Sequence, residues 1–152
     1  MVTAPPRHAV LTGAPGAGKT TLLDAAAAAG YRTSPEVARR LLQGPGGMDL
    51  RAADPQAFAE AMLEAHAREF ERHADHPGVV LFDRGFPDVA GFLDVSGLSV
   101  PASVDRACRS LRYAGPVLRA PPWRAIYARD DERIQTWDEA VASDAAITAA
   151  WK

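Results

Sequence analysis

The 152-residue sequence contains a single cysteine, only two lysines and no long hydrophobic run. The lone Cys108 excludes a disulfide framework and a cysteine-rich zinc site. The apolar runs are too short to span a membrane, and residues 1–7 contain no apolar signal-peptide core. A net charge of −2 supplies no basic field that would attract nucleic acid or an anionic membrane. We therefore expect a cytoplasmic protein with neither a nucleic-acid nor a membrane partner.

The composition is that of an ordinary ordered chain, with 47% hydrophobic and 24% charged residues. A chain of this length buries one core, so we expect a single domain over residues 1–152. Trp151 lies next to the last residue, and a bulky indole on a packed helix needs other residues to cover it. We therefore expect that a final strand of the sheet is missing.

Apolar runs and helical patterns alternate along the chain. The runs predict strands at 8–12, 31–33, 79–83 and 116–120, and the helical patterns cover 19–29, 35–42, 55–74, 102–113 and 132–151. Residues 43–49 are rich in glycine and proline and predict a mobile loop. This alternation is typical of an α/β fold in which helices cover both faces of a parallel sheet.

The first predicted strand is followed by a phosphate-binding loop of the pattern Gly-x-x-x-x-Gly-Lys-Thr, and a helix begins directly after it. Its residues are Gly13, Ala14, Pro15, Gly16, Ala17, Gly18, Lys19 and Thr20. Glycines let the main chain wrap closely around a phosphate, and the amide hydrogens and the helix N-terminus favour negative charge. Lys19 is the only lysine before the final residue, so its use here in an arginine-rich chain is informative.

The side chains around this loop have distinct expected roles toward a nucleoside triphosphate. We expect Lys19 to bind the β- and γ-phosphates, Thr20 to bind Mg²⁺ and Thr21 to reach the α-phosphate. The predicted cofactors are ATP and Mg²⁺, and the choice between ATP and GTP stays open.

A second motif, Asp83-Arg84-Gly85-x-x-Asp88, follows the four apolar residues of the third predicted strand. Carboxylates at this edge of a parallel sheet hold magnesium or accept a proton, so Asp83 is a candidate for either task. Arg84 is suited to bidentate contact with a phosphate.

With the segment Pro35-Glu36-Val37-Ala38-Arg39 and Asp131-Glu132-Arg133, these motifs resemble the AAA-domain ATP-binding proteins of the NadR type, over residues 8–152. That group is similar in fold to nicotinamide riboside kinases and, more distantly, to deoxynucleoside kinases. The resemblance implies a three-layer P-loop NTPase fold and a kinase of small molecules.

The resemblance also implies roles by position in the sequence. Glu36 and Asp83 are the two candidates for the general base, and the choice between them stays open. Arg39, Arg84 and Asp88 are expected to bind the acceptor or its phosphate. The remaining expected residues belong to a lid over the nucleotide and are Arg129, which binds the nucleotide, and Arg133, which is catalytic.

We therefore expect an enzyme that transfers the γ-phosphoryl group of ATP to a nucleoside-like hydroxyl. The alternative is an ATPase or nucleotide-dependent switch without a metabolite acceptor, in which ligand binding reshapes residues 43–53. The histidines at 66, 73 and 76 lack the neighbouring carboxylates of a metal site, so we expect them to be exposed helix residues. The sequence does not indicate an oligomeric state.

Overall fold

The computed structural model describes residues 7–14, 17–123 and 136–152, and its centre is a four-stranded parallel sheet. The strands are β1 (Arg7–Gly13), β2 (Arg32–Ser34), β3 (Val79–Asp83) and β4 (Val117–Ala120), in the spatial order β2-β3-β1-β4. The helices are α1 (Lys19–Ala28), α2 (Val37–Gln43), α3 (Gly47–Ala53), α4 (Pro55–Arg72), α5 (Phe86–Val95), α6 (Ala102–Ser110) and α7 (Trp137–Ala150).

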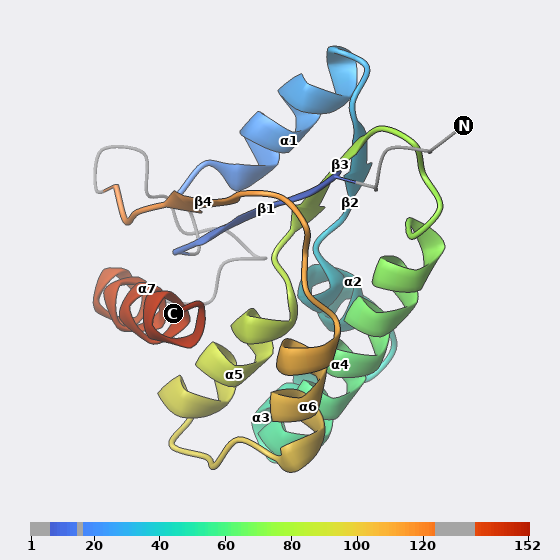
Figure 1. Ribbon diagram of the computed structural model, residues 1–152. Coiled ribbons are helices and arrows are strands. Elements are labelled where there is room, and N and C mark those ends of the chain that lie inside the picture. The colour runs from blue at the N-terminus through green and yellow to red at the C-terminus, as the bar shows by residue number, and fades with distance from the viewer. Residues whose placement is uncertain (1–6, 15–16, 124–135) are drawn as a thin grey trace.

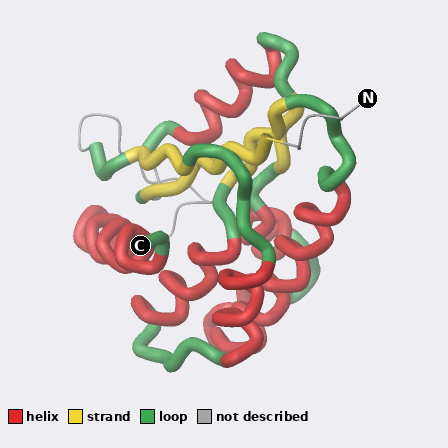
Figure 2. The backbone as a smooth tube through the Cα atoms, in the orientation of Figure 1, coloured by secondary structure: helices red, strands yellow, loops and turns green. Residues whose placement is uncertain are grey.

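The sheet lies between two layers of helix. Helix α1 covers one side, and the other helices gather on the opposite side, with α5 packed between α7 and α6 (Figure 1). The same arrangement is clear in the backbone trace, where the strands form one band between the helical layers (Figure 2). The predicted α/β fold with a parallel sheet and three layers is therefore confirmed.

The core follows from the apolar runs of the sequence. Val10, Val80 and Phe82 on the two central strands are fully or almost fully buried. A second apolar cluster, which includes Phe58 and Leu93, joins α2, α4, α5 and α6 below the sheet. Both clusters lie on the side of the sheet opposite α1, so α5 and its neighbours are held firmly beneath the carboxyl ends of the strands.

Helix α4 begins where the sequence predicts, because Asp54 accepts a hydrogen bond from the Ala57 amide and Pro55 occupies the first helical position. Farther along α4, the buried carboxylate of Glu69 accepts hydrogen bonds from Ser34 Oγ at 2.9 Å and from Arg40 Nη2 at 3.0 Å. Glu69 thereby ties α4 to β2 and α2, which fixes the helix that forms one wall of the site described below.

Two expectations are wrong, and one helix was missed. Residues 47–53 form helix α3 instead of a loop: Gly46 begins it with φ 72°, and Gly47 lies against α2 so closely that a Cβ there would be 1.8 Å from the Leu41 carbonyl oxygen. Helix α5 follows Asp83-Arg84-Gly85 and was not expected. His66 and His73 are buried, with 4% and 5% of their surfaces exposed, because α4 is covered by the sheet and α5.

No helix in the described part of the chain is both long and apolar enough to cross a membrane. In a parallel sheet the strands end at a common edge, and here that edge brings together three chain segments. They are the end of β1 at Gly13 with the loop that follows it, the segment after β2, which carries Glu36, and the segment after β3, which carries Arg84.

Candidate active site

The phosphate-binding loop links β1 to α1 and uses two glycines for conformations that other residues avoid. Gly13 has φ 130° and Gly18 has φ 87°. At Gly13 there is also no room, since a Cβ would lie 2.0 Å from the carbonyl oxygen of Ala120 on β4. Two residues of the motif, Pro15 and Gly16, lie outside the described residues. The described part has the backbone form that the motif predicts.

Lys19 lies inside the loop, with 6% of its surface exposed. Its ammonium nitrogen is 3.3 Å from the carbonyl oxygen of Ala14, to which it donates a hydrogen bond. Burial, with a smaller contribution from the charge of Arg84, lowers the pKa of Lys19 to about 8. At neutral pH the side chain therefore remains mainly charged. Thr20 and Thr21 are exposed in the first turn of α1.

Arg84 has φ 70°, which is a left-handed backbone conformation that a residue with a side chain seldom adopts. This turn directs its guanidinium back toward the phosphate loop, where Nη1 donates to the Gly13 carbonyl at 2.9 Å. Nε faces Glu36 Oε1 at 3.4 Å. Burial alone would lower the pKa of Arg84, but the carboxylates of Glu36 and Asp88 raise it, so the charge is fixed.

Asp88 holds this arrangement together from the first turn of α5. Its Oδ1 accepts from the Thr12 hydroxyl and from Arg84 Nη1, and its Oδ2 accepts from the Gly85 amide and from the indole of Trp151. A carboxylate has about four lone-pair sites, so the protein itself uses all of them. Asp88 is thus a buried hydrogen-bond acceptor that orients the Arg84 guanidinium.

Asp83 ends β3 and is 5% exposed, and its Oδ1 has no hydrogen-bond partner among the described residues. Burial, together with the negative charge of Glu36, raises the pKa of Asp83 to about 6. For Glu36 burial acts in the same direction, but the charges of Arg84 and Lys19 outweigh it and hold its pKa below the ordinary value. The two carboxylates therefore differ in their electrostatic surroundings.

An unsatisfied carboxylate oxygen of this kind suits a hard cation. Magnesium is commonly bound by one or two protein oxygens together with phosphates and water, and the exposed Thr20 hydroxyl and Asp83 supply that set. No larger cluster of metal-binding side chains occurs in residues 7–14, 17–123 and 136–152. The residues present fit Mg²⁺ accompanied by a nucleotide better than an isolated metal centre.

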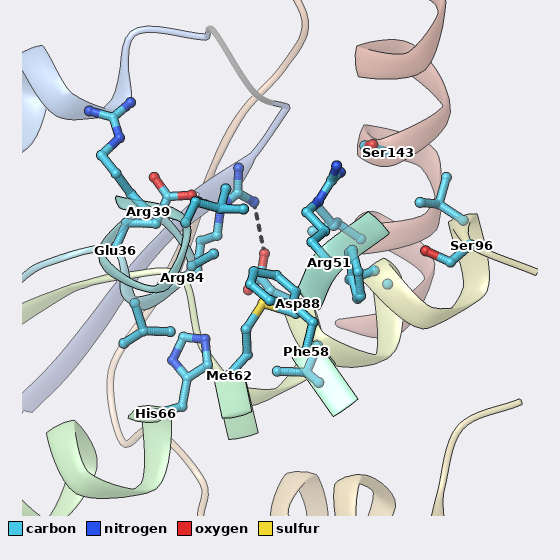
Figure 3. A pocket seen from close by; sticks show the side chains of 18 of the residues that line it. Glu36, Arg39, Arg51, Phe58, Met62, His66, Arg84, Asp88, Ser96 and Ser143 are labelled. Atoms are coloured by element: carbon cyan, nitrogen blue, oxygen red, sulfur yellow. Dashed lines mark hydrogen bonds and ion pairs between the residues drawn. The ribbon is translucent and has the colours of Figure 1, made fainter. Parts of the chain in front are cut away.

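A cavity of about 600 Å³ begins at the start of α1 and runs between α2, α3, α4, α5 and α7. Figure 3 shows Glu36, Arg39 and Arg84 at one end of it and Ser96 and Ser143 at the other. Apolar side chains make up much of the remaining lining and include Phe58, Met62, Val89, Phe92 and Ile147. The cavity is thus charged beside the phosphate loop, and beyond it apolar side chains are joined by Arg51 of α3 and Glu139 of α7.

The structure brings together most of the residues expected from the sequence. Lys19, Thr20, Glu36, Arg39, Arg84 and Asp88 all line the cavity. Arg129 and Arg133 of the expected lid lie outside the described residues, so their placement stays a prediction.

Among the cavity residues that the sequence reasoning missed are His66 and Arg51. Arg51 lies on α3 with its guanidinium carbon 5.7 Å from the centre of the Phe92 ring, and burial lowers its pKa. The signal for His66 was its spacing on α4, four residues after Met62 and eight after Phe58, which places all three on one helix face.

Residues 8–152 match the model of the AAA domain family, and the chain therefore belongs to that family. Among solved structures, deoxyadenosine kinase from M. mycoides with bound dATP is similar, with a TM-score of 0.66 and 13% sequence identity. The similarity covers 95% of this chain and 84% of that chain. A second structure of the same kinase, with the products dCMP and a flexible dCDP bound, has the same TM-score and identity and covers 95% and 83%.

No protein with a curated functional description matches the chain. At 13% identity the likeness to the kinase shows a shared fold, and it confirms the expected nucleoside-kinase-like P-loop architecture.

Proposed function

We propose that this member of the AAA domain family is a phosphotransferase that moves the γ-phosphoryl group of ATP to a hydroxyl of a nucleoside-like acceptor. The observation that carries the proposal is the cavity of about 600 Å³ that opens directly beside Lys19 and Thr20. Small-molecule sites typically enclose ~300–1,000 Å³, so the space suits a second substrate. An ATPase or a switch, with water as the acceptor, does not require a second substrate pocket of this size.

The lining supports an acceptor with a flat apolar part and a polar part. Phe58, Met62 and Phe92 offer aromatic and thioether surface on which a ring can pack. The charged end holds Glu36 and Arg84, where a reacting hydroxyl would meet the phosphate loop. A nucleoside has both parts, and the fold shared with deoxyadenosine kinase supports this choice of class.

Phosphoryl transfer passes through a loose transition state, so the protein contributes mainly position and charge. Lys19 and Arg84 bring two positive groups to the place where charge develops on the transferred group. Arg84 is held in place by the Gly13 carbonyl and Asp88, so it does not need to reorganise during the reaction.

The cavity favours separate tasks for the two carboxylates. Glu36 lines the cavity, where it can accept the proton of the acceptor hydroxyl, whereas Asp83 is not among the described lining residues. A general base must first be within reach of the proton, so we assign that role to Glu36. Asp83 and Thr20 would hold Mg²⁺, which supplies charge neutralisation on the phosphates when it is bound.

The test is a panel of ribo- and deoxyribonucleosides incubated with Mg²⁺ and either ATP or GTP. Phosphorylated product is measured by mass spectrometry, and the release of ADP or GDP is measured in parallel. We expect nucleoside-dependent product, and we expect Lys19→Ala to weaken ATP binding at least tenfold while the variant stays folded, because the loop loses its ammonium group. Release of ADP or GDP without any phosphorylated nucleoside would instead support the ATPase or switch and overturn the proposal.

A further inference from the structure

His66 lines the cavity from α4 and has no part in the reaction proposed above. Its side chain is 4% exposed, and Figure 3 shows the imidazole directed into the cavity, on the side of Glu36 and Arg84 rather than of Ser96 and Ser143. A histidine buried to this degree normally has a hydrogen-bond partner. Within the described part of the chain it has no hydrogen bond or ion pair, and its ring contact is with Phe86, 6.0 Å away between centroids.

The charges around His66 come from several elements. Asp88 and Arg84 act on it from α5 and the end of β3, Glu36 acts from the start of α2, and Glu69 acts from its own helix. Burial is the largest influence and lowers the pKa of His66 to about 4, so the ring is neutral over the physiological range. A neutral imidazole carries one donor nitrogen and one acceptor nitrogen.

This pair of groups limits what His66 can bind. A carboxylate or an ionised phosphate can only accept, so it could pair with the donor nitrogen alone, and an ammonium group can only donate, so it could pair with the acceptor nitrogen alone. A hydroxyl group both donates and accepts, and it therefore suits the neutral ring. The ring lies at the end of the cavity where the reacting hydroxyl of the acceptor is expected, so a second hydroxyl of the same molecule is the natural partner.

We propose that His66 recognises a second hydroxyl of the acceptor, separate from the one that receives the phosphoryl group, and so makes the site selective for sugar-like acceptors over simple alcohols. This inference rests on the proposed function. Removing that hydroxyl from the substrate leaves the buried imidazole without a partner, and an unpaired buried polar group is costly. His66 is then a specificity-determining residue that contacts the substrate, and it takes no proton in the reaction.

The experiment compares each ribonucleoside with its 2′-deoxy and 3′-deoxy forms, all of which offer the 5′-hydroxyl as acceptor. In the wild-type protein we expect kcat/KM to fall at least about tenfold for one of the two deoxy forms. In His66→Phe, which keeps the ring but has no polar atom, the ribonucleoside should lose a similar factor while that deoxy form does not. The ratio of kcat/KM for the ribonucleoside to kcat/KM for that deoxy form should therefore approach one in this variant.

Met62→Leu is the matched control, because Met62 lies one turn earlier on the same wall and contributes no hydrogen bond. We expect it to leave the ratio unchanged even where it changes both rates. His66→Asn, which keeps a donor and an acceptor, should restore part of the ratio. Thermal unfolding and ATP affinity establish that each variant is folded.

The outcomes separate the two proposals. Product formation with a ratio that His66→Phe leaves unchanged overturns the role of His66 alone. A wild-type protein that binds ATP but phosphorylates no nucleoside in the panel overturns the proposed function, and the role of His66 with it. Loss of the ratio in His66→Phe, with the ratio retained in Met62→Leu, supports both.

Discussion

The two ends of the site are constructed differently. The phosphate-binding end comes from one stretch of chain between β1 and α1, and its shape depends on local backbone conformations at Gly13 and Gly18. The acceptor end is assembled from α2, α3, α4, α5 and α7, and its geometry depends on contacts between residues far apart in sequence. A local sequence motif therefore determines the shape of the phosphate-binding end, whereas the packing of the whole fold determines the shape of the acceptor end.

This contrast explains why the acceptor end needs a buried carboxylate at its centre. Asp88 joins Thr12, Arg84 and Trp151, which lie on or beside three different elements. The described part of the phosphate loop is joined to other elements by main-chain groups: the Gly13 carbonyl accepts from Arg84, and the Ala14 amide donates to the Ala120 carbonyl. A change at the acceptor end should therefore affect both ends, and the following variants test that dependence.

The largest effect is expected from the two carboxylates that meet at the boundary between the ends. Glu36→Gln removes the assigned base and should lower kcat by roughly 10²–10⁴-fold without changing the Mg²⁺ concentration needed for half-maximal rate. Asp83→Asn should also lower kcat, but it should raise that Mg²⁺ requirement, because it weakens a proposed ligand. Steady-state kinetics over a Mg²⁺ series measures both quantities.

The carboxylate variants also settle which group acts as the base. If Asp83→Asn leaves the Mg²⁺ requirement unchanged while lowering kcat far more than Glu36→Gln does, the base is Asp83 and our division of tasks is wrong.

The next largest effect is expected on stability. Asp88→Ala leaves the buried guanidinium of Arg84 and the indole of Trp151 without their acceptor, so we expect the free energy of unfolding to fall by about 3–5 kcal/mol. Asp94→Ala on the same helix is the control, since Asp94 is exposed, and it should cost below about 0.5 kcal/mol. Urea unfolding compares the two, and similar losses in both would contradict a central role for Asp88.

The smallest effect is expected from pH. The active form needs ionised Asp83, with a pKa of about 6, and protonated Lys19, with a pKa of about 8. The kcat/KM of the free enzyme should therefore fall about tenfold per unit below the first value and about tenfold per unit above the second. In Lys19→Arg the decline at high pH should disappear, because guanidinium does not titrate there; a decline that persists would assign it to another group.

The contrast between local and long-range contacts also determines which features could be predicted from the sequence. β3 was expected at residues 79–83 and is found there, because four adjacent apolar residues ending in a carboxylate are typical of a buried parallel strand. The Lys19 helix and the cap of α4 at Asp54 were likewise local signals. In the site, the phosphate loop was predictable for the same reason.

The missed features depend on tertiary contacts. Helix α3 lies in a glycine-rich stretch, where the sequence favours a loop, and it is stabilised by packing against α2 and α4. His66 was expected at the surface; its spacing from Met62 and Phe58 places it on their helix face, but which elements cover that face depends on the whole fold. Its place in the cavity emerges only when these elements come together.

The indole of Trp151, directly after α7, connects the last helix to the active site. It donates to the carboxylate that orients Arg84, and a side-chain carbon placed on Gly85 would meet the same indole at 3.0 Å. Helix α7 also supplies Ser143 and Ile147 to the cavity wall. Any displacement of α7 must therefore pull on the Asp88 carboxylate, so the wall that would surround an acceptor and the arginine that would neutralise its new phosphate are mechanically linked.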